Sequence, residues 1–161
     1  MGLVFTPGDP LRQNTACTGN PRVTEPLETL ICYRLERAQE SLEDARLLAD
    51  ADRWNACVNR LYYSCFYAVS ALLVRDGLSS SRHTGVRSLL NRHYVRTGKV
   101  PRELARVYND LFEHRQEGDY ADFVRFQADQ VRPWMPQIEA FIAHMKALLN
   151  RDDPHPEQPC G

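Results

Sequence analysis

The sequence predicts an all-α protein, an antiparallel helical bundle of four to five helices. Three observations lead to this fold class. Apolar residues recur at intervals of three and four along most of the chain, which is the spacing of one helix face. Runs that alternate apolar and polar residues, as strands do, are almost absent. One central stretch, residues 54–74, is apolar on nearly every side.

Residues 54–74 (WNACVNRLYYSCFYAVSALLV) organise the rest of the chain. No charged residue lies between Arg60 and Arg75, and helical spacing places apolar residues on two opposite faces. A helix that is apolar nearly all round is buried on both sides. It is therefore the central helix of a bundle, or it faces its own bundle on one side and a second subunit on the other. Polar residues interrupt it, and it falls short of the roughly 18–20 continuous apolar residues of a membrane span.

Further amphipathic segments flank this stretch. A first helix is expected over residues 26–50, with Thr24 as its N-cap. Gly77 is expected to end the central helix, because glycine is the usual residue just past a helix C-terminus. A third helix is predicted over residues 82–96.

A fourth helix is expected to open at Pro101, since proline fits the first helical position. The last helix is predicted to begin near Arg132, or to be kinked there because two prolines follow, and to end near Asn150. One helical domain is thus expected over residues 24–150. Flexible tails, an N-terminal one over residues 1–23 and a C-terminal one over residues 151–161, are expected on either side.

The composition indicates a single domain in the cytoplasm. The chain has 161 residues and a net charge of −1, so any nucleic-acid contact must come from a local basic patch. Its five cysteines form no C-x-x-C pair, which is typical of reduced thiols and not of a disulfide framework. The N-terminus shows no signal-peptide pattern. No zinc pattern and no Glu-x-x-His pair can be drawn, so no metal and no cofactor is expected.

One segment, between Ser79 and Arg102, is basic because it contains no acidic residue. It forms either a face that contacts phosphate or simply charge exposed to solvent, and the two readings are equally favoured. His83 and His93 fall near the inward face of the same segment, where a hydrogen-bonded, buried or half-buried histidine is the favoured interpretation. The cations of the segment are Arg82, Arg87, Arg92, Arg96 and Lys99.

The apolar stripe of the fourth helix runs on into Arg115. An arginine at a core-facing position is costly unless it is paired. Asp119 lies four residues further on, within reach if the helix continues, so an inward ion pair is predicted, followed by Tyr120. The pair either joins the end of the helix to the next segment or lines a polar cleft at the bundle or dimer seam.

Several stretches, taken together and in order, resemble the HEPN superfamily, and most closely its short single-domain prokaryotic members of the toxin–antitoxin type. The stretches are NRLYYSCFYAVSALLV, H-T-G from His83, G-K-V-P from Gly98 and LFEHRQEGDYADF from Leu111. The likeness covers about residues 27–149. It implies a bundle of four or five helices that pairs into a homodimer. It also implies metal-independent ribonuclease activity, often of a toxin encoded beside a small nucleotidyltransferase that neutralises it.

In active members, the resemblance implies, an arginine is followed about four to six residues later by a histidine, and both subunits contribute these across the dimer cleft. Arg115 matches the arginine, but the next histidine is His144. Asp119 and Tyr120 stand where the histidine is expected, and His114 could supply an imidazole from another register. Arg115, Asp119 and His114 are therefore the candidate catalytic residues. The resemblance also implies that Tyr120 is a candidate for modification, since it matches a tyrosine that the partner nucleotidyltransferase modifies in some toxin–antitoxin pairs.

Three alternatives remain open. The first is a HEPN-like component of a toxin–antitoxin or defence system that binds or cleaves RNA at a cleft between two subunits. The second, favoured by the missing histidine, is a non-catalytic helical dimerisation or nucleotide-binding module that partners a separate nucleotidyltransferase. The third alternative is a structural four-helix bundle with no small-molecule site. RNA cleavage that depends on Arg115 would separate the first from the others.

Overall fold

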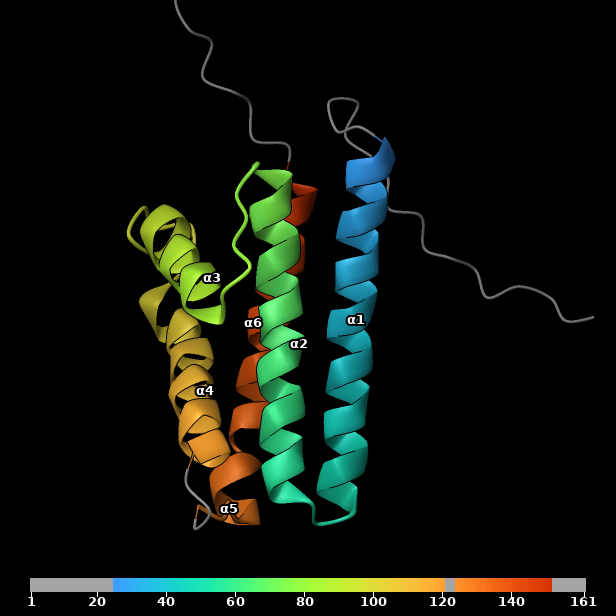
Figure 1. Ribbon diagram of the computed structural model, residues 1–161, viewed down its shortest axis with the longest axis vertical. Helices are drawn as coiled ribbons and strands as arrows, with labels where there is room; N and C mark the ends of the chain where they lie inside the picture. Colours follow the sequence, from blue (N-terminus) through green and yellow to red (C-terminus); the bar gives the residue numbers. More distant parts are fainter. Residues whose placement is uncertain (1–24, 121–123, 152–161) are drawn as a thin grey trace, which may run out of the picture.

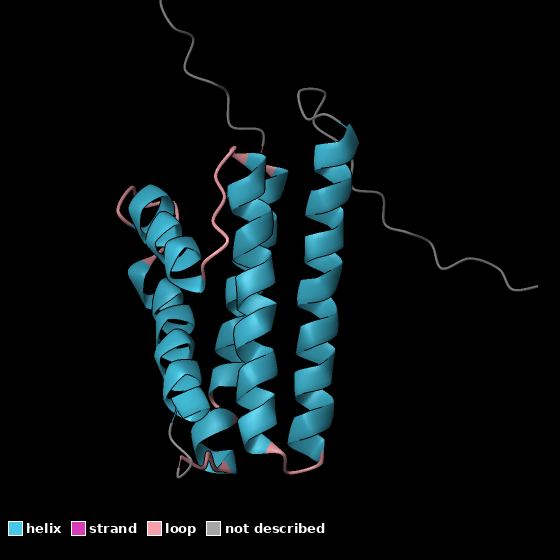
Figure 2. Ribbon diagram, viewed as in Figure 1, coloured by secondary structure: helices cyan, strands magenta, loops and turns pink. Residues whose placement is uncertain are grey.

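A computed structural model describes residues 25–120 and 124–151, with the backbone alone described for residues 116–120. Every regular element in these residues is helical, and no strand is present among them (Figure 2). The predicted all-α fold class is therefore confirmed. The elements are α1 (Glu25–Asp50), α2 (Trp54–Arg75), α3 (His83–Leu90), the π-helical segment η1 (Asn91–Val95), α4 (Arg102–Tyr120), α5 (Ala128–Val131) and α6 (Trp134–Asn150).

The four long helices lie side by side along the long axis of the molecule, and successive ones run in opposite directions (Figure 1). Helix α2 is central, since it contacts α1 on one side and α4 and α6 on the other. Helix α3 packs against α2, and η1 contacts α4 near its upper end (Figure 1). Helix α1 covers part of the second apolar face of α2, while Tyr63 and Tyr67 on that face stay partly exposed. Both readings of residues 54–74 therefore stay predictions.

The core is built around α2. Tyr62 of α2 stacks on Tyr108 of α4 with 5.8 Å between ring centroids, and Tyr108 stacks at the same distance on Phe141 of α6. Helix α2 is long and apolar enough to cross a membrane by length and composition, but 72% of its most apolar window is buried inside the bundle. Such burial is what the core helix of a soluble bundle shows.

Helix ends follow local chemistry. Gly77 follows α2 with a φ of 70°, and its N–H donates to the carbonyl of Val74 at 3.1 Å, as predicted for a helix-ending glycine. The third predicted helix is present over residues 83–95, and its second half is the π-helical segment η1. Both Leu90 and Tyr94 are nonetheless buried. The hydroxyl of Tyr94 donates to the carboxylate of Asp76, which ties η1 to the end of α2.

The last predicted helix is also divided. Helix α5 ends at Val131, and α6 begins at Trp134 directly after Pro133, whose backbone nitrogen has no hydrogen to donate. The break therefore falls where the prolines predicted it. Helix α4 continues through Gly118 to Tyr120. The two predicted tails lie outside the described residues, apart from Arg151.

Candidate functional site

Helix α4 carries Arg115 to a pair of tyrosines on α2. The guanidinium carbon lies 5.0 Å from the ring centroid of Tyr62 and 5.3 Å from that of Tyr63. Its Nη2 atom donates to the hydroxyl of Tyr63 at 3.3 Å. The faces of aromatic rings attract a cation, and a planar guanidinium can stack on them. The two rings thus help to offset the cost of bringing Arg115, which is half-buried, to the inward position predicted for it.

His83, the first residue of α3, meets the same tyrosine pair. Its Nδ1 atom shares a hydrogen bond of 2.8 Å with the hydroxyl of Tyr62. Its ring centroid lies 5.9 Å from that of Tyr63 and 4.5 Å from that of Phe66. His83 is half-buried and hydrogen-bonded, as its position near the inward face predicted. We refer to Arg115, His83, Tyr62, Tyr63 and Phe66 as the Arg115 cluster.

The protonation states in the Arg115 cluster follow from burial and charge. Burial lowers the pKa of His83, and the positive charge of Arg115 lowers it further, so the imidazole is neutral at pH 7. Burial raises the pKa of Tyr62 to about 12, so its hydroxyl keeps its proton. The cluster therefore combines one permanent cation, one neutral imidazole and a neutral hydroxyl hydrogen-bonded to that imidazole.

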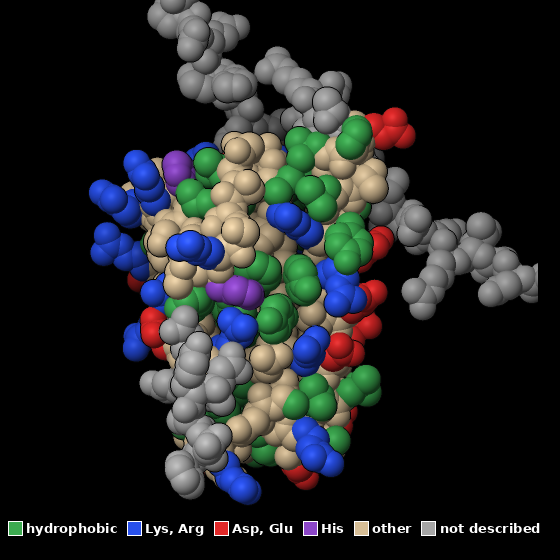
Figure 3. All heavy atoms as spheres, viewed as in Figure 1, with side chains coloured by type: hydrophobic (Ala, Val, Ile, Leu, Met, Phe, Trp, Pro, Cys, Tyr) green, Lys and Arg blue, Asp and Glu red, His purple; other side chains and the backbone are tan. Residues whose placement is uncertain are grey.

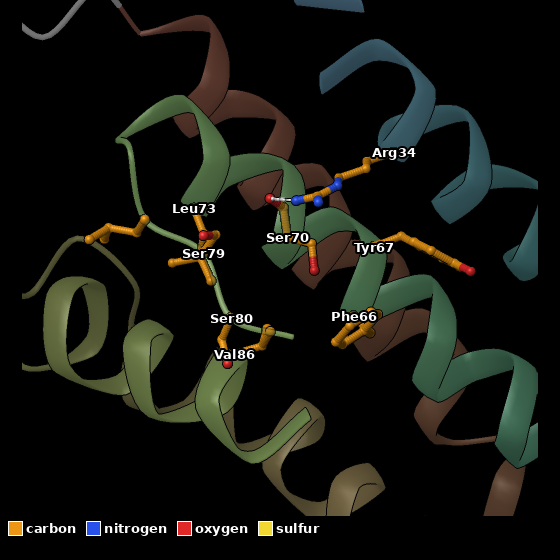
Figure 4. A pocket seen from close by; sticks show the side chains of 9 residues that line it. Arg34, Phe66, Tyr67, Ser70, Leu73, Ser79, Ser80 and Val86 are labelled. Atoms are coloured by element: carbon orange, nitrogen blue, oxygen red, sulfur yellow. Dashed lines mark hydrogen bonds between the residues drawn. The ribbon is translucent and has the colours of Figure 1, made fainter. Parts of the chain in front are cut away.

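A pocket of about 120 Å³ adjoins the cluster (Figure 4). Arg34 reaches into it from α1 and donates from Nη1 to the carbonyl of Ser70 at 2.7 Å. Phe66, which packs on His83, also forms part of the pocket wall. The remaining walls come from α2, from the loop after it and from α3, through Tyr67, Leu73, Leu78, Ser79, Ser80 and Val86.

The predicted phosphate-binding residues divide into two kinds. Arg87 is held by α4, because it pairs with Glu113 and lies 4.0 Å from the ring centroid of Phe112. The other four cations are exposed, and Lys and Arg side chains gather over α3 and the neighbouring part of α4 in Figure 3. Acidic side chains gather along α1 at the opposite edge of the same view. The exposed cations are Arg82, Arg92, Arg96 and Lys99.

His114 contacts a different group of aromatic rings from Arg115, the next residue in the sequence. It stacks on Trp134 with 5.1 Å between ring centroids and meets Phe126 edge-on at 5.6 Å. Adjacent helical residues diverge by about 100°, so His114 turns toward α6 where Arg115 turns toward α2. The backbone at Asp119 is helical, but the side chains of residues 116–120 lie outside the description. The predicted Arg115–Asp119 ion pair therefore stays a prediction.

Sequence reasoning missed that His83 and the two tyrosines surround Arg115. The signals were present in the chain, in the H-T-G stretch and in the N-R-L-Y-Y run. Spacing alone could not join them, because 32 positions separate His83 from Arg115 and the approach depends on how α3 and α4 each pack against α2. Only the packing of three helices brings these side chains together.

The fold and the site define an all-α helical bundle in which an arginine and a histidine from different helices meet on one tyrosine pair. A sequence model of the HEPN domain matches residues 32–148, and the chain belongs to this family. A UPF0332 protein of Thermotoga maritima is 46% identical over 122 residues, which are 76% of this chain and 92% of that protein. A Methanocaldococcus jannaschii protein named "Putative toxin MJ0142" is 28% identical over 128 residues, 80% of this chain and 84% of that protein.

Proposed function

We propose that this protein is a toxin-like HEPN component of a toxin–antitoxin or defence system, which binds RNA and cleaves it at a cleft between two subunits. The observation that carries the proposal is the Arg115 cluster, in which an inward arginine and a neutral histidine share the ring of Tyr62. Membership of the HEPN family supports it. Two relatives from Methanocaldococcus jannaschii whose names contain the word toxin support it as well.

The chemistry of the cluster suits a phosphodiester. A guanidinium binds phosphate oxygens and stabilises the negative charge that builds up on phosphorus during transesterification. Tyr63, Phe66 and Tyr67 are partly exposed on the same face of α2, and single-stranded RNA is held by stacking of its bases on such rings. Arg82, Arg92, Arg96 and Lys99 would hold the flanking phosphates.

The proposal includes a homodimer, because resemblance to the HEPN superfamily implies a cleft to which two subunits contribute. Light scattering on the purified protein would give a mass near twice that of the 18.5 kDa chain. A mass of one chain at micromolar concentration, with full activity, would contradict this part of the proposal.

The proposal also includes a small nucleotidyltransferase as the neutralising partner, with Tyr120 as the residue it would modify. Co-expression with a small nucleotidyltransferase, followed by intact mass measurement, would show one added nucleotidyl group. The added mass would disappear in Tyr120→Phe. An unchanged mass together with stable co-purification and no RNA cleavage would favour the alternative, a non-catalytic dimerisation or nucleotide-binding module.

The first experiment is inducible expression in a bacterial host, comparing wild type with Arg115→Ala. We expect the wild type to arrest growth and degrade RNA, and Arg115→Ala to do neither. Arg46→Ala is a matched control, because Arg46 lies exposed on α1 and pairs with Glu139 at 2.7 Å, remote in sequence from the cluster. Normal growth and intact RNA with soluble, well-expressed wild type would contradict the proposal.

A further inference from the structure

We propose that His83 is the proton-transfer residue of this site and acts on RNA together with Arg115. This inference rests on the proposed function and extends it. The residues after Arg115 supply no histidine before His144. An imidazole from the start of α3 nevertheless lies on the same tyrosine as the guanidinium and within range of its charge. His83 and Arg115 lie against both rings of the tyrosine pair, at centroid distances of 5.7 and 5.9 Å for His83.

The other histidines of the described chain are committed elsewhere or lie on other surfaces. His114 stacks on Trp134. The Nε2 atom of His144 donates a hydrogen bond of 2.9 Å to the carbonyl of Lys99. His93 lies in η1, among the exposed arginines. Of these four, His83 is the one that shares the ring of Tyr62 with Arg115.

The hydrogen bond to Tyr62 determines which imidazole nitrogen can react. It occupies Nδ1, while Nε2 has no hydrogen-bond partner among the residues that the structure describes. A hydroxyl can donate to a bare Nδ1 or accept from a protonated one, so Tyr62 can follow His83 through both protonation states. When Nδ1–H donates to the Tyr62 oxygen, Nε2 keeps its lone pair and can act as a base. Tyr62 is accordingly a positioning residue.

The electrostatics favour the base form at the start of the reaction. The pKa of His83 is lowered by burial and then by Arg115, so the neutral imidazole predominates at pH 7. A base whose pKa lies near or just below the working pH is available for proton abstraction. Arg115 cannot lose its own proton at such pH and remains a cation for the phosphate.

The proposed step is a transesterification within the RNA. Nε2 of His83 takes the proton of a ribose 2′-hydroxyl, and the 2′-oxygen forms a bond to the adjacent phosphorus. The bond from phosphorus to the 5′-oxygen breaks, and Arg115 stabilises the charge on the phosphate oxygens. The 5′-oxygen leaves with a proton from water, and the hydroxide that remains takes the proton from His83. The products carry a 2′,3′-cyclic phosphate and a 5′-hydroxyl.

The test compares His83→Asn with wild type on a single-stranded oligoribonucleotide, and measures initial rate, product ends and pH dependence. An asparagine can keep a hydrogen bond to Tyr62 but has no titratable group. We expect the rate to fall by about 10²-fold or more, which is the usual contribution of a positioned acid–base group. Binding of a 2′-O-methyl version of the RNA, which cannot be cleaved, should stay within about twofold. His93→Asn serves as the matched control and should cleave like wild type.

The pH profile separates a proton-transfer role from a structural one. The wild-type rate should rise with pH through the pKa of His83 and level off by about pH 7. Tyr62→Phe should lower kcat more than it changes KM. It should also shift the pH range over which the rate rises. If His83→Asn cleaves within about threefold of wild type while Arg115→Ala does not cleave, the inference is wrong and the proposed function stands. If wild type cleaves no RNA, both are overturned.

Discussion

The imidazole of His83 and the hydroxyl of Tyr62 are joined by a hydrogen bond of 2.8 Å, although 21 positions separate the two residues. The bond links the first residue of α3 to the middle of α2. It also brings the imidazole beside Arg115, which lies over the ring of the same tyrosine. The contact that docks α3 is therefore also the contact that assembles the candidate site, and its loss should affect stability and activity together.

Tyr62→Phe tests the contribution of this bond to stability. The ring keeps its stacking on Tyr108, so the substitution removes the hydroxyl and little else. We expect the free energy of unfolding to fall by about 1 kcal/mol, the typical net value of one hydrogen bond. Urea unfolding followed by circular dichroism measures it. A variant at least as stable as wild type would show that the bond does not hold α3 in place.

The acid limb of the stability curve gives an independent prediction for His83. The pKa of its imidazole is lowered from 6.5 in the folded protein, so between the folded value and 6.5 the unfolded chain binds more protons. Stability must then rise with pH across that window and become independent of this group above about 6.5. His83→Asn should lose less stability than wild type between pH 7 and pH 5. Parallel curves for the two proteins would contradict the lowered pKa.

Local chemistry explains which parts of this protein could be read from its sequence. Gly77 and Pro133 act through their own backbone, so the end of α2 and the break before α6 fell where they were predicted. Arg115 was predicted to point inward because the stripe of α4 leads into it. The tyrosines and the histidine around it were not predicted, since their approach depends on the packing of α2, α3 and α4. The π-helical turn was not predicted either, and its Tyr94 donates a hydrogen bond to Asp76 of a distant segment.

The arginines of the basic segment should separate by experiment into structural and RNA-binding residues. Arg92 and Arg96 are exposed, so Arg92→Gln with Arg96→Gln should leave stability unchanged. The double variant should weaken RNA binding. Each phosphate contact to a single strand contributes about 0.7 to the slope of log K against log salt, so the loss of two contacts should make the slope shallower by about 1.4. Fluorescence anisotropy at several salt concentrations measures the slope. An unchanged slope would show that Arg92 and Arg96 are only charges exposed to solvent and do not contact phosphate.

Arg87→Gln should behave in the opposite way. Arg87 pairs with Glu113 and lies over the ring of Phe112, so its loss removes contacts between α3 and α4. We expect a loss of stability of about 1 kcal/mol, and a salt slope within error of wild type. A shallower slope with unchanged stability would place Arg87 among the residues that contact phosphate.

Gly85 offers a test of how the loop after α2 positions α3. A Cβ atom added at Gly85 would lie 2.0 Å from the Oγ atom of Ser80 and 2.8 Å from its Cβ atom, so the loop and the first turn of α3 cannot keep their present contact. We expect Gly85→Ala to destabilise the protein by about 1–3 kcal/mol, as overpacking does. It should also displace His83, two residues earlier, and so reduce RNA cleavage.

Ser80→Gly in the Gly85→Ala background removes both clashing atoms and provides the decisive control. If crowding between Ser80 and the new Cβ atom is the cause, Ser80→Gly should restore most of the stability and RNA cleavage that Gly85→Ala removed. The coupling energy between the two substitutions would then be opposite in sign to their single effects. If the two substitutions are simply additive, the contact between Ser80 and Gly85 does not position α3. The hydrogen bond between His83 and Tyr62 would then be the stronger constraint on where the imidazole lies.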